Sequence, residues 1–271
     1  MVKLGVIGVG SMGGAIIRGL LSSGQLAPGE ILVFNRSRER LRSLQAEFSL
    51  PVAPNAHRVA QEAEYLLLGV KPFMIAPLLD ELGDALAAKP VVISIAAGTP
   101  IAKIEEHLPE KTPLVRVMPN VNAQIGQSMS GIAANQYVSA QALSEVRAMF
   151  ESIGKTALVA EEHFAIFSAL AGCSPAWVYR FIDSLAQAGV AHGFKKEEAT
   201  RIVAQAVAGS ALNVLGNLSP GLNPQGLIDQ VCSPGGTTVA GLLAMEDAGF
   251  SPAARSAVFA AVKRDKDLSG S

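Results

Sequence analysis

The sequence has few cysteines, no excess of either charge and no long hydrophobic run. Only two of its 271 residues are cysteine, Cys173 and Cys232, which is too few for a disulfide framework. The formal net charge is -1 and no basic run exceeds pairs such as Lys195 and Lys196, so we expect no nucleic-acid partner. No uninterrupted apolar run reaches the roughly 20 residues of a membrane span, so we expect a cytoplasmic protein without a membrane partner.

The composition nevertheless supports a large folded core. Hydrophobic residues make up 49% of the chain and charged residues 17%, which excludes a disordered protein. The length suggests two domains, at about 150 residues each. We expect no metal site, because the four histidines are scattered without the spacing of metal ligands: His57, His107, His163 and His192.

Apolar runs alternate with helical patterns through the first half of the chain. Short apolar runs bounded by Gly, Pro or Asn predict strands at residues 3–8, 31–35, 65–70, 90–95 and 114–118. Helical patterns lie between them at residues 11–23, 37–47, 74–86 and 100–107. This alternation predicts an α/β fold with a doubly wound parallel sheet of the Rossmann type, which binds ligands beyond the carboxyl ends of its strands.

The first predicted strand ends in G-V-G-S-M-G, where Gly8, Gly10 and Gly13 fit the pattern G-x-G-x-x-G. Such glycines allow a tight turn, a close approach of the backbone to a pyrophosphate, and close packing of helix on strand. The second strand ends in N-R-S-R, residues 35–38, without the acid that would hold an NAD ribose. Arginine and serine suit a 2′-phosphate, so NADPH is favoured and NADH is the alternative. The alternative for the glycine motif is a turn that binds no ligand. The alternative for Arg36 and Arg38 is a solvated helix start.

The second half reads as helical. One long apolar helix is expected over residues 164–190, interrupted near Gly172 and Pro175, and another over 196–215. Further helices are expected from about residues 224, 237 and 252. We therefore predict an NADP-binding Rossmann domain at residues 1–158 and an all-α dimerisation and substrate-binding domain at residues 159–271. Helices that are apolar on more than one face predict a homo-oligomer.

These motifs together resemble the pyrroline-5-carboxylate reductases over essentially the whole chain. The resemblance is carried by G-V-I-G-V-G-S-M-G, V-K-P, S-I-A-A-G, R-V-M-P-N and, most specifically, by D-Q-V-C-S-P-G-G-T-T at residues 229–238. It implies NADPH-dependent reduction of 1-pyrroline-5-carboxylate to L-proline, the last step of proline synthesis. It also implies a homodimer, which some members of the family assemble into rings.

The resemblance assigns roles to individual residues. The implied cofactor contacts are Ile7, Gly8, Val9, Gly10, Ser11, Met12, Asn35, Arg36, Ser37, Asn55, Gly69, Val70, Lys71, Pro72, Ala96, Ala97, Gly98 and Asn120. The implied substrate contacts are Glu161, Gln230, Ser233, Gly235, Gly236, Thr237 and Thr238.

The glycine-rich turn before Thr237 has a chemical rationale. It opens a predicted helix, whose free N–H groups favour an anion such as the substrate carboxylate. The Thr238 hydroxyl, as the catalytic group, can hydrogen-bond the ring nitrogen while C=N becomes C–N. A cyclic imine is basic enough to be protonated near neutral pH, so no strong enzymic acid is required. An N-capping threonine without a ligand is the alternative.

Three departures from the family pattern bear on the substrate. The chain has A-G-C-S-P-A-W at residues 171–177 where the family has S-G-S-G-P-A-Y, M-P-N-V-N at 118–122 instead of M-P-N-T-P, and Gln230 where asparagine is common. A different cyclic imino acid is therefore an alternative substrate. The two cysteines lie in these segments, and buried packing is preferred to a redox role.

Two other functions are compatible with parts of this sequence. A β-hydroxyacid dehydrogenase would also pair a Rossmann half with a helical half, but its catalytic lysine has no counterpart in A-G-V-A-H-G-F at residues 188–194. A relative that binds NADPH without catalysis, as a regulatory subunit, would explain the altered segment at residues 171–177. The retained Gly235, Gly236 and Thr238 argue against it.

Overall fold

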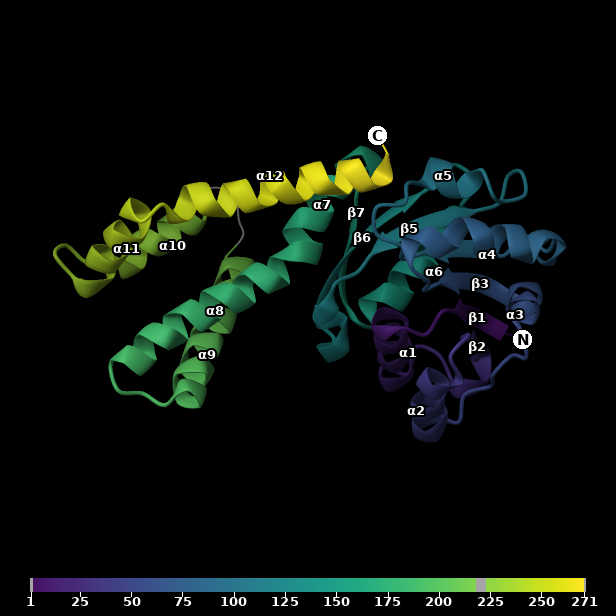
Figure 1. The fold of residues 1–271 in the computed structure, drawn as a ribbon, viewed down its shortest axis with the longest axis horizontal. Coiled ribbons are helices and arrows are strands. Elements are labelled where there is room, and N and C mark those ends of the chain that lie inside the picture. The colour runs from purple at the N-terminus through teal and green to yellow at the C-terminus, as the bar shows by residue number, and fades with distance from the viewer. Residues whose placement is uncertain (1, 218–222, 271) are drawn as a thin grey trace. The chain divides into compact units, whose positions relative to one another are not determined.

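The structure is a computed structural model that describes residues 2–217 and 223–270. Its first part contains a seven-stranded sheet in the order β2-β1-β3-β4-β5-β6-β7 (Figure 1). Neighbouring strands run parallel except β5 and β6, which are antiparallel. The strands are β1 (Val2–Ile7), β2 (Ile31–Phe34), β3 (Ala63–Leu68), β4 (Val91–Ser94), β5 (Leu114–Met118), β6 (Ser128–Ala134) and β7 (Gly154–Leu158). The predicted Rossmann-type sheet is confirmed, as are its first five strands.

Helices cover both faces of this sheet. They are α1 (Ser11–Ser22), α2 (Arg38–Phe48), α3 (Ala56–Glu62), α4 (Ile75–Leu82), α5 (Ile101–Glu105), α6 (Ala140–Glu151) and α7 (Phe164–Phe167). The prediction of one helix over residues 74–86 is corrected, because α4 stops at Gly83 and a 3₁₀ turn follows. Gly83 has a φ of 41°, which a continuing α-helix cannot contain.

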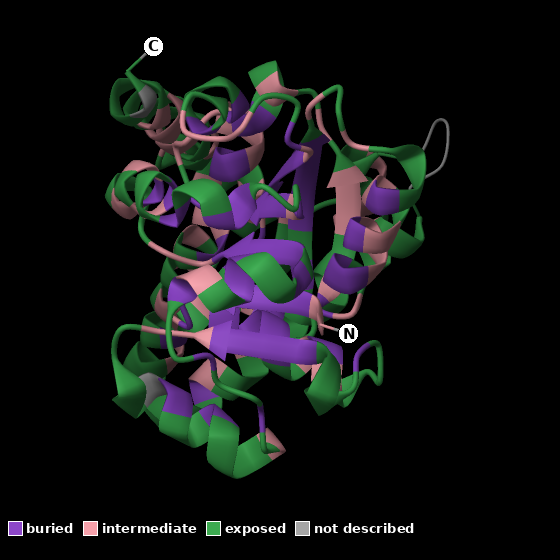
Figure 2. Ribbon diagram, turned by 90° about the vertical axis from the view of Figure 1, so that its right-hand side faces the viewer, coloured by how far each residue is buried: buried purple, intermediate pink, exposed green. Residues whose placement is uncertain are grey.

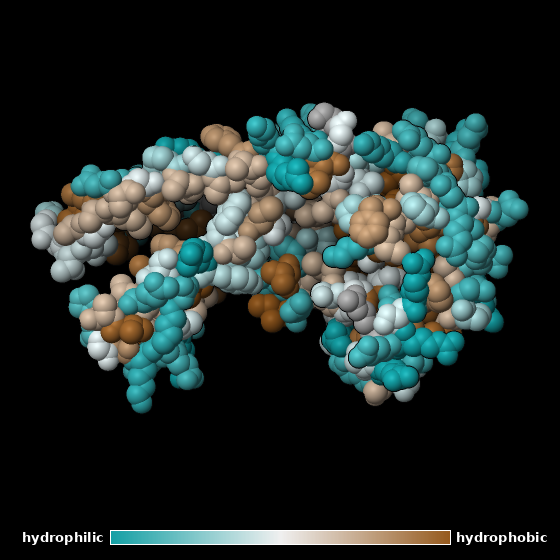
Figure 3. Space-filling view, in the orientation of Figure 1, coloured by the Kyte–Doolittle hydropathy of each residue, from teal (hydrophilic) through white to brown (hydrophobic). Residues whose placement is uncertain are grey.

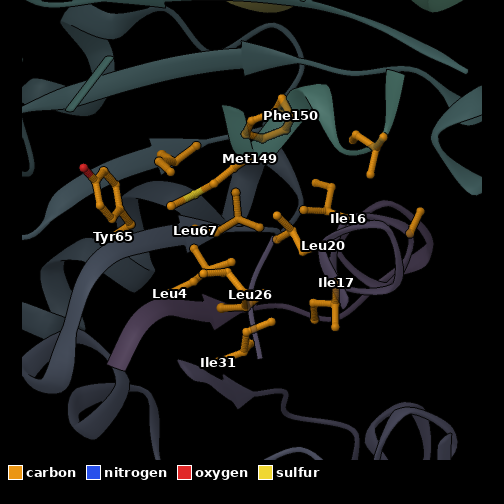
Figure 4. Close-up of a cluster of buried hydrophobic side chains, with 14 of the residues drawn as sticks. Leu4, Ile16, Ile17, Leu20, Leu26, Ile31, Tyr65, Leu67, Met149 and Phe150 are labelled. Atoms are coloured by element: carbon orange, nitrogen blue, oxygen red, sulfur yellow. The ribbon is translucent and has the colours of Figure 1, made fainter. Parts of the chain in front are cut away.

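Alternate residues of each central strand point into opposite cores. Tyr65 and Leu67 belong to a cluster with residues of α1 and α6, whereas Leu66 and Leu68 belong to a second cluster with residues of α3 and α4. The strands are therefore buried on both faces (Figure 2), as a parallel sheet requires. Figure 4 shows the first cluster, whose labelled members are Leu4, Ile16, Ile17, Leu20, Leu26, Ile31, Tyr65, Leu67, Met149 and Phe150.

A charged cluster fixes the start of β1. Lys3 pairs with Glu64 at 2.9 Å and with Glu145 of α6 at 2.6 Å, and its ammonium lies 5.0 Å from the centroid of the Tyr65 ring. Burial lowers the pKa of Lys3, but its bonds to the two glutamates outweigh this and raise the pKa. The bond from Lys3 lowers the pKa of Glu145, while burial and the bond to Glu145 raise the pKa of Tyr65 to about 12. At neutral pH the Tyr65 phenol is therefore protonated. The two ion pairs of Lys3 tie β1 to β3 and α6.

The carboxyl ends of the parallel strands are level with one another. Ile7 is paired in register with Phe34 on one side and with Leu68 on the other. Leu68 is in turn level with Ser94, and Ser94 with Arg116. The segments that follow these five residues must therefore meet along one edge, and this edge is where the predicted cofactor residues lie.

The second part of the chain is helical. A π-helical segment, Ser168–Cys173, leads into α8 (Ser174–Ala191), and α9 (Lys196–Gly216), α10 (Pro224–Val231), α11 (Thr237–Asp247) and α12 (Phe250–Ser269) follow. The predicted interruption near Gly172 is thus a π segment, and Pro175 lies in the first turn of α8, where its missing N–H is harmless. The chain divides into a unit of Met1–Cys173 with Ala261–Ser271 and a helical unit of Ser174–Ala260. The functional boundary at residue 158 stays a prediction.

The helical unit has almost no core of its own. Of its described residues only Pro175, Ala186 and Ala199 are buried. Hydrophobic side chains instead reach its surface in several places (Figure 3), among them Tyr179, Leu185, Phe194, Ile202, Leu212, Leu215, Val231, Leu243, Phe250 and Phe259. Apolar surface on this scale marks an interaction site.

One helical stretch among the described residues, Glu161–Ala191, is long and apolar enough to span a membrane by length and composition, with a mean hydropathy of 1.2. The expectation of no membrane span stays a prediction. A single helix of this kind is weak evidence for a membrane, because helices that pack against protein have the same composition.

Candidate active site

Three glycines pack together at the carboxyl edge of the sheet. Gly8 has a φ of 96°, and a Cβ atom there would lie 2.7 Å from the carbonyl carbon of Gly69. A Cβ at Gly13 or at Gly69 would lie 2.7 Å or 2.3 Å from the Gly8 oxygen. No side chain can enter these contacts without moving the backbone, so the turn brings β1, α1 and β3 as close as their backbones allow.

Asn35 fixes the same turn from the second strand. Its Oδ1 accepts a hydrogen bond from the Val9 N–H at 2.9 Å, and its Nδ2 donates to the Ser37 carbonyl at 2.8 Å. The Gly8 N–H also donates to the Phe34 carbonyl at 3.0 Å. The glycine turn and the loop that begins α2 are therefore held as one body, with the start of α1 beside them.

A cleft of about 1470 Å³ runs along this edge. Fourteen predicted cofactor residues line it: Ile7, Gly8, Gly10, Ser11, Met12, Asn35, Arg36, Ser37, Gly69, Val70, Lys71, Pro72, Ala96 and Ala97. The free N–H groups at the start of α1 border it, and α1 has no acidic residue in its first turn. An anion such as a pyrophosphate fits this environment.

The other four predicted cofactor residues do not line the cleft. Val9 is buried, and Gly98 lies in the loop beyond Ala97 with a φ of 65°. Asn55 caps α3 by accepting from the Arg58 N–H at 2.9 Å. Asn120 is buried, and its amide donates to the Ala171 carbonyl of the π segment at 2.9 Å. Their contacts with a cofactor stay predictions.

Sequence reasoning missed one wall of the cleft. It is formed by the 3₁₀ turn at Pro72–Met74 and the exposed face of α4, and it contributes Phe73, Met74, Pro77, Leu78 and Glu81. Phe73 is 79% exposed. The signal was present in an apolar helix directly after V-K-P, but only the fold shows which of its faces borders the cleft.

Glu161 lies near the carboxyl ends of β4 and β5. Its Oε1 accepts hydrogen bonds from the Ile101 N–H at 2.7 Å and from Arg116 Nη1 at 3.0 Å. The predicted substrate contact is therefore already engaged by two groups of the same unit.

The remaining predicted substrate residues lie in the helical unit around the turn from α10 to α11. Gly235 has a φ of 68°, and the Gly236 N–H donates to the Ser233 carbonyl at 3.0 Å. A Cβ at Gly236 would lie 2.4 Å from Ser233 Oγ. Thr237 and Thr238 form the exposed first turn of α11, which has no acidic residue and no side-chain cap. Gln230 is exposed near the end of α10. The turn thus presents free N–H groups and two hydroxyls to an incoming anion.

Both cysteines are free thiols of intermediate exposure. Burial, reinforced by the negative charge of Asp265, raises the pKa of the Cys173 thiol. A protonated thiol is a poor nucleophile, which agrees with a packing role for Cys173.

The glycine-packed turn, the cleft and the start of α1 without an acidic residue are typical of dinucleotide-dependent oxidoreductases. The chain is 35% identical to the pyrroline-5-carboxylate reductase of Escherichia coli (strain K12) over 269 residues, which cover 99% of each chain. It belongs to the pyrroline-5-carboxylate reductase family, which confirms the resemblance and excludes the β-hydroxyacid dehydrogenase alternative as its family.

Family models and solved structures agree with this assignment. Residues 161–268 match the model described as pyrroline-5-carboxylate reductase dimerisation, and residues 3–98 match NADP oxidoreductase, coenzyme F420-dependent. The 1-pyrroline-5-carboxylate reductase of Streptococcus pyogenes shares 37% identity, with a TM-score of 0.87 over 98% of each chain. The Plasmodium falciparum pyrroline carboxylate reductase with NADP bound shares 29% identity, with a TM-score of 0.89 over 99% of this chain and 98% of that one. The apolar stretch Glu161–Ala191 thus begins a region that matches a dimerisation domain.

Proposed function

We propose that the chain reduces 1-pyrroline-5-carboxylate to L-proline with NADPH in the cytoplasm. The observation that carries this proposal is that one chain contains both a glycine-packed cleft and an S-P-G-G-T-T turn that opens α11. Full-length relatives named for this activity support it.

The chemistry asked of the protein is modest. When bound, the reduced nicotinamide supplies a hydride to the imine carbon, and the protonated ring nitrogen takes the electron pair of the C=N bond. The N–H groups of the Ser233–Thr238 turn hold the carboxylate, and the Thr238 hydroxyl fixes the ring nitrogen by a hydrogen bond. Orientation of the two reactants then provides most of the rate.

Ring size tests the substrate, because the altered segments at residues 118–122 and 171–177 leave a six-membered imino acid as the second candidate. We expect kcat/KM for the five-membered ring to exceed that for the six-membered ring by roughly tenfold or more, as one methylene changes binding by about 1–3 kcal/mol. The measurement is steady-state NADPH oxidation with each imine. Faster reduction of the larger ring would transfer the proposal to that substrate, and tight NADPH binding without any turnover would favour the regulatory alternative.

Cofactor choice depends on the loop after β2. Arg36 and Ser37 line the cleft at the start of α2, where a 2′-phosphate meets a guanidinium, a hydroxyl and free N–H groups. Glu39 and Glu81 line the same cleft, and their negative charges repel the 2′-phosphate of NADPH. NADH, which lacks this phosphate, therefore remains a usable cofactor.

Replacement of Arg36 by alanine is expected to lower the NADPH-to-NADH ratio of kcat/KM by roughly 10- to 100-fold, the value of one charged hydrogen bond. Activity with NADH should stay within a factor of about two. The control is Arg42→Ala, in the helix that follows Arg36 but outside the cleft lining. An unchanged ratio in Arg36→Ala would contradict this role.

The helical unit is proposed to pair with a second copy of the chain. Its exposed apolar helices and its match to a dimerisation domain support a homodimer, and rings of dimers are the further possibility that the family resemblance implies. Light scattering that gave the mass of one chain, 28.1 kDa, would contradict the homodimer.

A further inference from the structure

An ion pair links Arg116 of β5 to Glu161 in the 3₁₀ turn Glu161–His163, which precedes α7. Arg116 is 6% exposed, and its Nη1 donates to Glu161 Oε1 at 3.0 Å. Its guanidinium also lies 4.4 Å from the centroid of the Phe164 ring, and Phe164 is buried. A charge at this depth requires a partner, because an unpaired buried cation is strongly unfavourable. Glu161 therefore cannot leave Arg116 without cost.

The same carboxylate oxygen caps a helix that lies far away in the sequence. Glu161 Oε1 accepts from the Ile101 N–H at 2.7 Å, and Ile101 is the first residue of α5. Pro100, the residue before it, offers no side-chain cap. Glu161 thus supplies from 60 residues away the acceptor and the negative charge that a helix start requires.

The segment between β4 and α5 forms a wall of the cofactor cleft through Ile95, Ala96 and Ala97. At its first end the Ala96 N–H donates to Ser94 Oγ at 3.3 Å, and Ser94 is level with Arg116 in the sheet. At its other end the bond from Ile101 to Glu161 fixes the start of α5. Glu161 therefore fixes the α5 end of this wall directly, and Arg116 acts on the wall through Glu161.

This wall lies on the β4 side of the glycine turn, whereas Arg36 and Ser37 lie on the β2 side. A dinucleotide that places its adenosine phosphate at Arg36 and its pyrophosphate at the glycine turn brings its nicotinamide toward β4. We propose that Arg116 and Glu161 are positioning residues, which hold the Ile95–Ala97 wall against the nicotinamide half of the cofactor. This inference rests on the proposed function and gives Glu161 a task other than contact with the imino acid.

The test is the Kd of NADPH, measured by fluorescence titration without any imino acid. Glu161→Ala should raise this Kd roughly tenfold, because it removes the hydrogen bond that fixes the start of α5 and leaves Arg116 buried without its carboxylate partner. Arg116→Met should raise the Kd by a similar factor. The Kd of the double variant should be no higher than that of the single variant with the higher Kd, since both side chains act through one contact. Glu161→Gln keeps an acceptor for Ile101 and should raise the Kd only about threefold.

Glu162→Ala is the matched control, because Glu162 is the exposed neighbour in the same 3₁₀ turn, and its NADPH Kd should equal that of the unaltered chain. An unchanged NADPH Kd in Glu161→Ala with a raised KM for the imine would overturn the proposal in favour of direct substrate contact. If Glu161→Ala does not fold, an unchanged Kd in Glu161→Gln decides the question in the same way. Failure of the unaltered chain to reduce any imine would refute the proposed function while leaving this binding measurement valid.

Discussion

Thr238→Ala is expected to lower kcat/KM for 1-pyrroline-5-carboxylate by about 100-fold, the usual effect of losing one hydrogen bond that strengthens in the transition state. Thr238 lies in the exposed first turn of α11, so the change removes a hydroxyl without opening a cavity. The loss should fall on kcat as well as on KM, because the ring nitrogen changes from C=N to C–N during the step. The Kd of NADPH should not change, since the glycine turn at Gly8 is untouched.

Thr238→Ser is the control for this prediction. Serine keeps the hydroxyl at the same distance from the backbone and should retain activity within a factor of about three. Equal losses in the serine and alanine variants would mean that the threonine methyl group matters and that the hydroxyl does not. Full activity in Thr238→Ala would remove the residue from the catalytic machinery.

Gly8→Ala is expected to reduce the free energy of unfolding by about 2–4 kcal/mol and to abolish measurable NADPH binding. The left-handed φ of 96° disfavours alanine, and the added Cβ would lie 2.7–2.8 Å from the backbone of Gly69 and from Val70 Cγ1. The two Gly69 atoms belong to the backbone, so no flexible side chain can give way at that contact. Relief would require β1 and β3 to separate where the pyrophosphate is proposed to bind.

Chemical denaturation and NADPH titration measure the two parts of this prediction. Gly29→Ala is the matched control, since a Cβ there meets nothing within 4 Å, and its stability and cofactor affinity should stay near those of the unaltered chain. A Gly8→Ala protein with unaltered stability and NADPH affinity would show that the packed turn tolerates a side chain, contrary to its geometry.

The central sheet could be predicted from sequence because its inner strands are buried on both faces. Runs such as Y-L-L-L and V-V-I-S carry the β-branched and aliphatic residues that such strands require. β6 and β7 escaped prediction because S-M-S-G-I-A-A and G-K-T-A-L are rich in small and polar residues. β6 pairs with β5 and β7 pairs with β6, and this pairing supplies what local propensity lacks.

Several contacts between distant segments could not be predicted. The ion pair of Arg116 and Glu161, the bond from Asn120 to the π segment and the α4 wall of the cleft join residues that share no local pattern. The glycine turn could be predicted because most of what requires glycine there lies within one short motif. Gly8 has a positive φ, and Gly8 and Gly13 make close backbone contacts, to which Gly69 at the end of the neighbouring strand adds a third.

The most direct test of the proposed function is a parallel measurement of NADPH consumption at 340 nm and of proline formed from 1-pyrroline-5-carboxylate. We expect one proline for each NADPH oxidised, with slower turnover when NADH replaces NADPH. NADPH that binds and is not consumed, or is consumed without stoichiometric proline, would contradict a reductase that forms proline.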